Sequence, residues 1–347
     1  SACLVGSEMC IRDRFKSESG HQMALSFSPD GRKLALASAS DNGMVHIWDL
    51  KTGRKLRELP ACRASRLVFA PTGKELAVWS GSSIRLWDVE TGKETPRLDG
   101  HEDCITDLTF SADGKVLASC SSEQVLLWDA ATGRPLPSPT GRRGGSSLCF
   151  SPDGSVLAFC ESELAVDLWD VAARKYRHRL ETPPKDGVSY PARLTALTPD
   201  GKTLVRAGMK SGIDLWDAGT LTKKRHIQPY PPPQEEGRPD TGLSSAALSP
   251  DGKTLATTGI GEAGVRLWEL SSGREVRRFE EHEGRAHAAA FSPDGQALAY
   301  GAGSGIWIVQ PATGKPIRQF KGVGHAYGLA FAPDGRTLAS GNLDGTI

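Results

Sequence analysis

A short tetrad of turn-forming residues recurs along this chain and limits how the chain can fold. Ser/Ala-Pro-Asp-Gly or a near variant ends at eight glycines, and successive gaps are 42, 41, 40, 47, 51, 43 and 40 residues. These glycines are Gly31, Gly73, Gly114, Gly154, Gly201, Gly252, Gly295 and Gly335. In a tight turn proline presets φ, aspartate caps the backbone and glycine adopts the left-handed conformation. Each tetrad therefore predicts a reversal of the chain.

Two further landmarks keep a constant place after each tetrad. A tryptophan followed by Asp or Glu ends an apolar run in six units, at Trp48, Trp87, Trp128, Trp169, Trp216 and Trp268. Five residues after the tryptophan stands a glycine, at Gly53, Gly92, Gly133 and Gly273, and Gly314 ends the same turn in the seventh unit. Counting back from Gly314 puts Val309 in the tryptophan position, so Trp307 is predicted to be out of register.

The segments between these landmarks have the pattern of half-buried strands. Residues alternate with period 2 in Met23–Phe27 before the first tetrad and in Lys33–Ala37 after it. The tryptophan run adds a third strand, and Lys55–Leu59 or Glu275–Phe279 a fourth, in which Arg and Lys favour a solvent-exposed edge. One such meander is marginally stable alone, whereas radially arranged copies bury each other's faces. We predict an all-β protein, a β-propeller of four-stranded antiparallel blades with seven complete blades and a truncated eighth.

With these motifs, the chain from Arg14 to Ile347 resembles the WD-repeat (tryptophan-aspartate repeat) β-propeller family. Gly20-His21, Gly100-His101 and Gly324-His325 match the family's Gly-His pair, and Asp344 matches its turn aspartate. In that family His, Ser or Thr, Trp and Asp form a hydrogen-bonded network within a blade. Most blades here lack a member of that network, so we expect packing to stabilise them more than buried polar contacts. The resemblance implies a non-catalytic protein–protein interaction scaffold.

The first residues share no pattern with the rest of the chain. Leu4 to Asp13 read as the translation of an adapter used in sequencing libraries, so residues 1–13 are predicted to be an adapter-like artefact and not native. Residues 14–347 are then expected to be a bacterial-type propeller, a metagenomic fragment truncated at both ends. Since eight first strands are predicted, the parent is either an eight-bladed ring or a tandem array of propellers.

Composition and motifs exclude several function classes. The net charge of +1, without a long basic block, argues against nucleic acid and anionic membranes as partners. No cofactor, metal or catalytic motif is found. Five cysteines outside the first residues resemble small apolar strand residues: Cys62, Cys104, Cys120, Cys149 and Cys160. Unpaired thiols weakly favour a reducing compartment such as the cytoplasm. The alternative is an eight-bladed quinoprotein-like enzyme, because Asp88 to Lys93 matches part of that motif. Pro96 stands where that motif has tryptophan.

Two connections between a fourth strand and the next first strand are longer than the others. They run from Glu181 to Arg193 and from His226 to Gly242, and the second contains the stiff, proline-rich segment Pro229–Pro233. We expect both inserts to stand side by side over the fifth and sixth blades. The predicted partner-binding residues are Tyr190, Arg193, Tyr230 and Arg238, and the partners are expected to be proteins or peptides. The alternative is that both inserts are solvent-facing loops without a function.

Overall fold

The computed structural model describes residues 3–4, 23–38, 44–60, 66–95, 98–139, 144–161, 165–181, 192–209, 212–229, 242–260, 264–280, 285–303, 305–323 and 325–342. Regular structure in these ranges consists of strands β1 to β30. No helix within the same ranges has the length and apolarity to cross a membrane. Contacts divide the chain into two compact units, residues 100–281 and residues 1–99 with 282–347.

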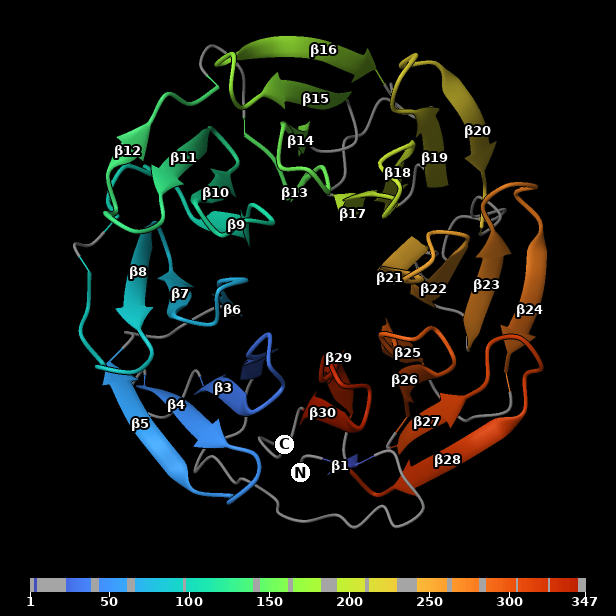
Figure 1. Ribbon diagram of the computed structural model, residues 1–347. Helices are drawn as coiled ribbons and strands as arrows, with labels where there is room; N and C mark the ends of the chain where they lie inside the picture. The colour runs from blue at the N-terminus through green and yellow to red at the C-terminus, as the bar shows by residue number, and fades with distance from the viewer. Residues whose placement is uncertain are drawn as a thin grey trace. The chain divides into compact units, whose positions relative to one another are not determined.

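The unit formed by residues 100–281 contains four sheets, the third to sixth blades (Figure 1). The third has β9 (Ile105–Phe110), β10 (Val116–Ser121), β11 (Val125–Asp129) and β12 (Pro135–Leu136), and the fourth has β13 (Ser147–Phe150), β14 (Val156–Glu161), β15 (Ala165–Asp170) and β16 (Lys175–Glu181). The fifth has β17 (Ala192–Leu197), β18 (Thr203–Gly208), β19 (Gly212–Asp217) and β20 (Lys223–Ile227), and the sixth has β21 (Gly242–Leu248), β22 (Thr254–Ile260), β23 (Val265–Glu269) and β24 (Glu275–Phe279). In every sheet the strands pair antiparallel in chain order.

The other unit contains the first, second and seventh blades and a smaller eighth sheet. The first has β2 (Met23–Phe27), β3 (Lys33–Ser38), β4 (Met44–Asp49) and β5 (Lys55–Pro60), and the second has β6 (Arg66–Phe69), β7 (Glu75–Ser80) and β8 (Ser83–Asp88). The seventh has β25 (Ala286–Phe291), β26 (Leu298–Ala302), β27 (Gly305–Val309) and β28 (Pro316–Lys321). The eighth combines β29 (Ala326–Phe331), β30 (Thr337–Asn342) and β1 (Cys3–Leu4). β1 lies within residues 1–13, which share no pattern with the repeats.

In the second blade a fourth segment pairs with β8 through isolated bridges, Ile84 with Leu98 and Trp87 with Glu94. The repeated four-stranded meander is the blade of a β-propeller. The described residues thus confirm the predicted fold class: an all-β propeller with seven blades and a smaller eighth sheet.

The hydrophobic core lies between successive sheets. One cluster joins Val166, Leu168 and Leu180 of the fourth blade to Leu204 and Trp216 of the fifth. Equivalent clusters join the third blade to the fourth and the fifth to the sixth, and in the other unit the first to the second. Within each unit, these neighbouring blades bury their apolar faces against one another, as the repeat predicted.

The two kinds of turn have the geometry that their residues predict. In the first tetrad, Asp30 accepts from the Ser28 hydroxyl and the Arg32 amide, and Gly31 has φ 67°. All eight tetrad glycines have positive φ. The glycine five residues after the tryptophan also has positive φ, but Arg174 (φ 55°) and Leu221 (φ 59°) hold that position in the fourth and fifth blades.

The strand register confirms the assignment of the seventh unit. In six blades the tryptophan lies opposite a leucine of the preceding strand, as in Leu34 with Trp48 and Leu255 with Trp268. In the seventh blade, Leu298 lies opposite Val309, so Trp307 is two residues out of this register.

Candidate functional site

The structure describes one of the four predicted partner-binding residues. Arg193 lies on β17, with its side chain exposed. Tyr190, Tyr230 and Arg238 lie outside the described residues. The described part of the insert face therefore consists of the strand ends that flank the two inserts.

Arg193, the last residue of the first insert, contacts Leu243, the residue that follows the second insert. Its Nε donates to the carbonyl oxygen of Leu243 at 3.3 Å, and Nη2 lies 3.7 Å from the sulfur of Met209. Leu243 in turn donates its backbone N–H to the carbonyl oxygen of Met209 at 2.8 Å. The first insert ends on the fifth blade and the second ends on the sixth, so this contact brings their ends together.

The start of the second insert is also held. Pro229 is buried, and its carbonyl oxygen accepts a hydrogen bond of 2.6 Å from Nη1 of Arg266. Arg266 lies on β23 with 9% of its surface exposed, and the same Nη1 lies 3.5 Å from a carboxylate oxygen of Glu275. A buried guanidinium that bonds a carbonyl and a carboxylate is a strong anchor. Pro229, which follows β20 of the fifth blade, is therefore held by a hydrogen bond from the sixth blade.

Neither Met209 nor Arg266 was among the predicted site residues. At the same position of the third strand other blades carry Leu126 or Asp167, while the second carries Arg85, which donates to the carbonyl oxygen of Pro60 at 2.8 Å. An arginine there signals a polar partner from outside the blade. Its partner, a backbone carbonyl of the insert, has no signature in the sequence.

Some of the predicted repeat residues form a hydrogen-bonded network. In the third blade Ser119 lies between Nε2 of His101, at 2.7 Å, and Nε1 of Trp128, at 3.0 Å. The turn before the tryptophan strand, Ser121 to Gln124, contains no aspartate, and the buried Nδ1 of His101 has no hydrogen-bond partner. Burial lowers the pKa of His101 to about 4, so its imidazole is neutral at pH 7.

The other blades depart from this network at one position of the second strand. In the sixth blade Trp268 donates to the Thr257 hydroxyl at 2.9 Å. Val78 and Phe159 hold that position in the second and fourth blades, and the indole N–H groups of Trp87 and Trp169 have no hydrogen-bond partner. His21 and Asp344 lie outside the described residues, and His325 is exposed beside His287. In these blades, packing holds the tryptophan without a hydrogen bond from its indole.

The aspartates of the repeat act as turn caps. Asp88 accepts from the amide and the hydroxyl of Thr91, as Asp49 does from Thr52 and Asp129 from Thr132. These hydrogen bonds hold the pKa of Asp88 below its ordinary value. Of the cysteines, Cys120 and Cys160 are buried strand residues as predicted, while Cys104 is exposed in the loop before β9. No group of three or more His, Cys, Asp or Glu within the described ranges is arranged to hold a metal.

Six of the blades thus share a third strand that ends in tryptophan followed by an acidic turn residue. Comparison with known families agrees: residues 12–49, 92–129 and 314–347 match the model of the WD domain, G-beta repeat. These stretches are WD40 repeats.

Three relatives are similar to parts of the chain. The small ribosomal subunit protein RACK1 of Schizosaccharomyces pombe is 34% identical over 25% of this chain and 28% of its own length. Transducin beta-like protein 2 of Homo sapiens is 34% identical over 26% of this chain and 23% of its own. Pre-mRNA-processing factor 19 of Oryza sativa subsp. japonica is 40% identical over 19% of this chain and 12% of its own. The chain thus matches less than a third of each relative's length.

Proposed function

We propose that this protein is a non-catalytic scaffold for protein–protein interaction, built on a WD-repeat propeller of residues 14–347 within a larger bacterial polypeptide. Its partners are proteins or peptides, and they bind over the fifth and sixth blades at the face of the inserts. The similarity to parts of RACK1 and transducin beta-like protein 2 supports the scaffold class. The bacterial origin is supported by a similar WD repeat-containing protein of Synechocystis, which is 33% identical over 60 residues.

The observation that carries this proposal is the convergence of the two inserts. Arg193 bonds Leu243 at the end of the second insert, and Arg266 bonds Pro229 at its start. Rigid strands thus present two long connections at neighbouring positions, which is the arrangement of a recognition surface on a scaffold. Within it, Tyr190, Tyr230 and Arg238 belong to the inserts, and tyrosine and arginine are enriched where partners bind.

The role of Asp88 supports a scaffold over the quinoprotein-like alternative. Its carboxylate caps a turn in the same manner as Asp49 and Asp129, and the corresponding residues of other blades keep the same role. A residue that is repeated in several blades with one set of hydrogen bonds serves the blade. We therefore propose no cofactor.

The test uses peptides selected from a random library against the wild-type protein. Their affinities are then measured by fluorescence anisotropy for a variant in which a Gly-Ser linker replaces residues 230–239, and for Arg193→Glu. Both variants are expected to lose at least about tenfold in affinity, since charged contacts at an interface specify partners. Two variants serve as controls: Arg193→Lys, which keeps the charge, and Lys115→Glu, which changes an exposed cation of the third blade. Selected peptides that bind every variant equally well exclude the insert face as the binding surface.

A further inference from the structure

A cavity opens between the fourth and fifth blades at the end of the strands opposite the inserts. It measures about 570 Å³ and is walled by the tetrad turns of both blades and by the turn from Asp217 to Leu221. Its apolar lining comes from both blades: Val156, Leu168, Leu180, Leu204, Trp216 and Leu221. A cavity of this size, with an apolar floor and polar groups at its edge, has the composition of a ligand-binding site.

At two other seams, the first–second and the fifth–sixth, an arginine crosses to the turn of the next blade. Arg57 of β5 donates from Nε to the carbonyl oxygen of Val89 in the second blade at 3.2 Å, and from Nη2 to that of Glu90. Arg225 of β20 donates to the carbonyl oxygen of Ser271 in the sixth blade at 3.1 Å. Both arginines cross a turn glycine, and a Cβ at Gly92 or Gly273 would contact their side chains.

The fourth and fifth blades differ at both positions of this pair. His178 lies opposite Leu168, in the register that Arg57 and Arg225 have in their blades. Leu221 stands where the other turns have Gly92 or Gly273. The side chain of His178 is shorter than that of an arginine. The side chain of Leu221 also occupies the space over the turn that an arginine would need. The seam is therefore left without its arginine cover, and the cavity opens there.

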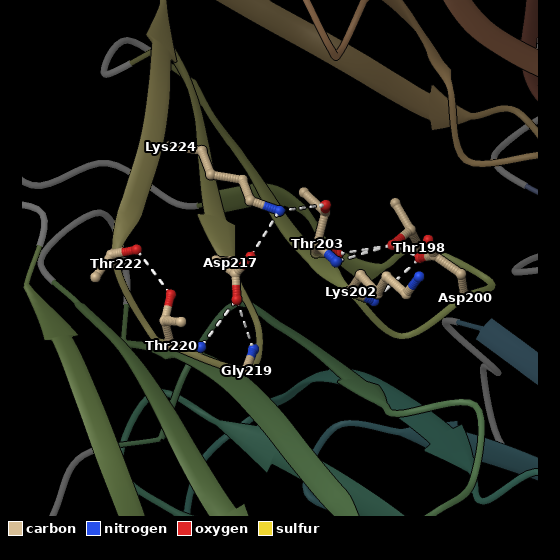
Figure 2. Close-up of polar contacts among 9 residues, drawn as sticks. All are labelled: Thr198, Asp200, Lys202, Thr203, Asp217, Gly219, Thr220, Thr222 and Lys224. Atoms are coloured by element: carbon tan, nitrogen blue, oxygen red, sulfur yellow. Dashed lines mark hydrogen bonds and ion pairs between the residues drawn. The ribbon is translucent and has the colours of Figure 1, made fainter.

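The charged groups around the cavity differ in whether they already have hydrogen-bond partners. Asp217 accepts from the amides of Gly219 and Thr220 and pairs with Lys224 at 3.0 Å, as Figure 2 shows. The same figure shows Asp200 accepting from Thr198 and from the Lys202 amide. Asp153 likewise accepts from Ser151 and Ser155. These bonds keep the pKa of each carboxylate low, so all three are ionised but already hydrogen-bonded.

Two cations at the cavity are in a different situation. Arg177 and Lys202 line it with exposed side chains. Across the described residues, neither of them forms an ion pair within 4 Å. Within the described residues their side-chain N–H groups have no hydrogen-bond partner, and the charge of Lys202 also helps to lower the pKa of Asp200.

We infer that this groove binds a short acidic peptide segment of a partner protein, with a leucine-like anchor side chain in the cavity and flanking carboxylates on Arg177 and Lys202. The apolar floor excludes water from the anchor, and the two cations select carboxylates over other polar groups. The site lies at the opposite end of the strands from the insert face, so the two surfaces are separate. Its biological use rests on the proposed scaffold function.

The test measures the anisotropy of a fluorescein-labelled peptide, Gly-Asp-Glu-Leu-Leu-Asp-Glu-Gly, titrated with the full chain. We expect saturable binding that weakens at least about tenfold when both leucines are replaced by alanine, or when the four acids are replaced by lysine. Arg177→Glu and Lys202→Glu are each expected to weaken binding about fivefold or more. Lys253→Glu is the matched control, because Lys253 has the same place in the tetrad turn of the sixth blade, outside the cavity.

A double variant, His178→Arg with Leu221→Gly, rebuilds the arginine–glycine pair of the first–second and fifth–sixth seams. It is expected to cover the groove and abolish peptide binding while circular dichroism and thermal unfolding remain those of a folded protein. The insert-shortened variant is expected to bind this peptide normally, which separates a failure of this inference from a failure of the insert face.

Three outcomes would overturn the inference. The first is equal or tighter binding of the lysine peptide, and the second is unchanged binding to the double variant. The third is that the groove binds an amphiphile such as decanoate but not the acidic peptide. Binding of the amphiphile, followed in competition assays, would then be lost in the double variant. In that case the site is one for a small molecule.

Discussion

Arg225 of the fifth blade lies across Gly273 of the sixth and donates from Nη2 to the carbonyl oxygen of Ser271 at 3.1 Å. Gly273 has φ 72°, which favours glycine, and the arginine that crosses the turn leaves no room for a side chain there. Arg57 and Gly92 repeat the relationship between the first and second blades. A hydrogen bond between neighbouring blades thus depends on a missing side chain in a turn.

Gly273→Ala is expected to lower the free energy of unfolding by about 2–4 kcal/mol. The left-handed backbone costs an alanine about 1–2 kcal/mol, and moving Arg225 breaks a charged hydrogen bond. Gly322→Ala is the control, because Gly322 has φ 69° with open space around it, and about 1–2 kcal/mol is expected. Urea denaturation measures both. Equal losses in the two variants would show that Arg225 adds nothing at Gly273.

Arg174→Gly is expected to stabilise the protein. Arg174 is exposed with φ 55°, a conformation that glycine adopts without strain. Relief of about 1–2 kcal/mol outweighs the greater freedom of glycine in the unfolded chain, for a net gain of about 0.5–1 kcal/mol. Leu221→Gly relieves the same strain but removes a side chain that packs on the core of the fourth and fifth blades, so no such gain is expected. Thermal unfolding of both variants distinguishes these effects.

Ser119→Ala tests the polar network of the third blade. It leaves the buried Nε2 of His101 and Nε1 of Trp128 without their partner, and a loss of about 2–4 kcal/mol in unfolding free energy is expected. Val78→Thr is the converse change, because Val78 holds the same position beside the unpartnered indole of Trp87. The new hydrogen bond and the burial of a hydroxyl nearly cancel, so a change below about 1 kcal/mol is expected. A similar loss in both variants would argue against the network.

Stability is expected to depend on pH through His101. Burial lowers its pKa from 6.5 to about 4, so the unfolded chain binds a proton below pH 6.5 that the folded protein does not. Stability is therefore complete above pH 6.5 and falls as the pH drops toward 4, by at most about 1.4 kcal/mol per pH unit. His101→Gln keeps a donor for Ser119 but does not titrate. Urea midpoints between pH 7 and 4 should fall less steeply for the variant, and parallel curves would contradict the assignment.

Much of this architecture was predictable because it depends on local stereochemistry. The tetrad ending at Gly31 has the φ, the aspartate cap and the strand reversal that its residues predict. The position of Val309 opposite Leu298 followed from counting back from Gly314, since a hairpin with a fixed turn fixes its register. Whether a tryptophan has a side-chain acceptor follows from one position of the repeat, which holds Ser119 in the third blade but Val78 and Phe159 in the second and fourth.

The candidate binding surfaces were only partly predictable. The long connections marked the insert face, and Arg193 lies at its edge, but its bond to Leu243 joins residues that are 50 positions apart. The anchoring of Pro229 by Arg266 is likewise a contact between a backbone carbonyl and a distant side chain. Such contacts depend on how one blade packs against another, which no local pattern encodes.

The sequence alone determined that this protein consists of four-stranded blades with tight turns and charged edge strands. The alternation of apolar residues along a strand and the φ preferences of Pro, Asp and Gly both act over a few residues. Only the tertiary structure decided that an arginine crosses the first–second and fifth–sixth seams while a cavity opens at the fourth–fifth seam. That choice depends on whether the fourth strand of one blade carries an Arg225 or a His178, and on whether a Gly273 or a Leu221 faces it from the next blade. Both halves of each pair are needed, because a guanidinium reaches a neighbouring carbonyl only where no side chain blocks its path.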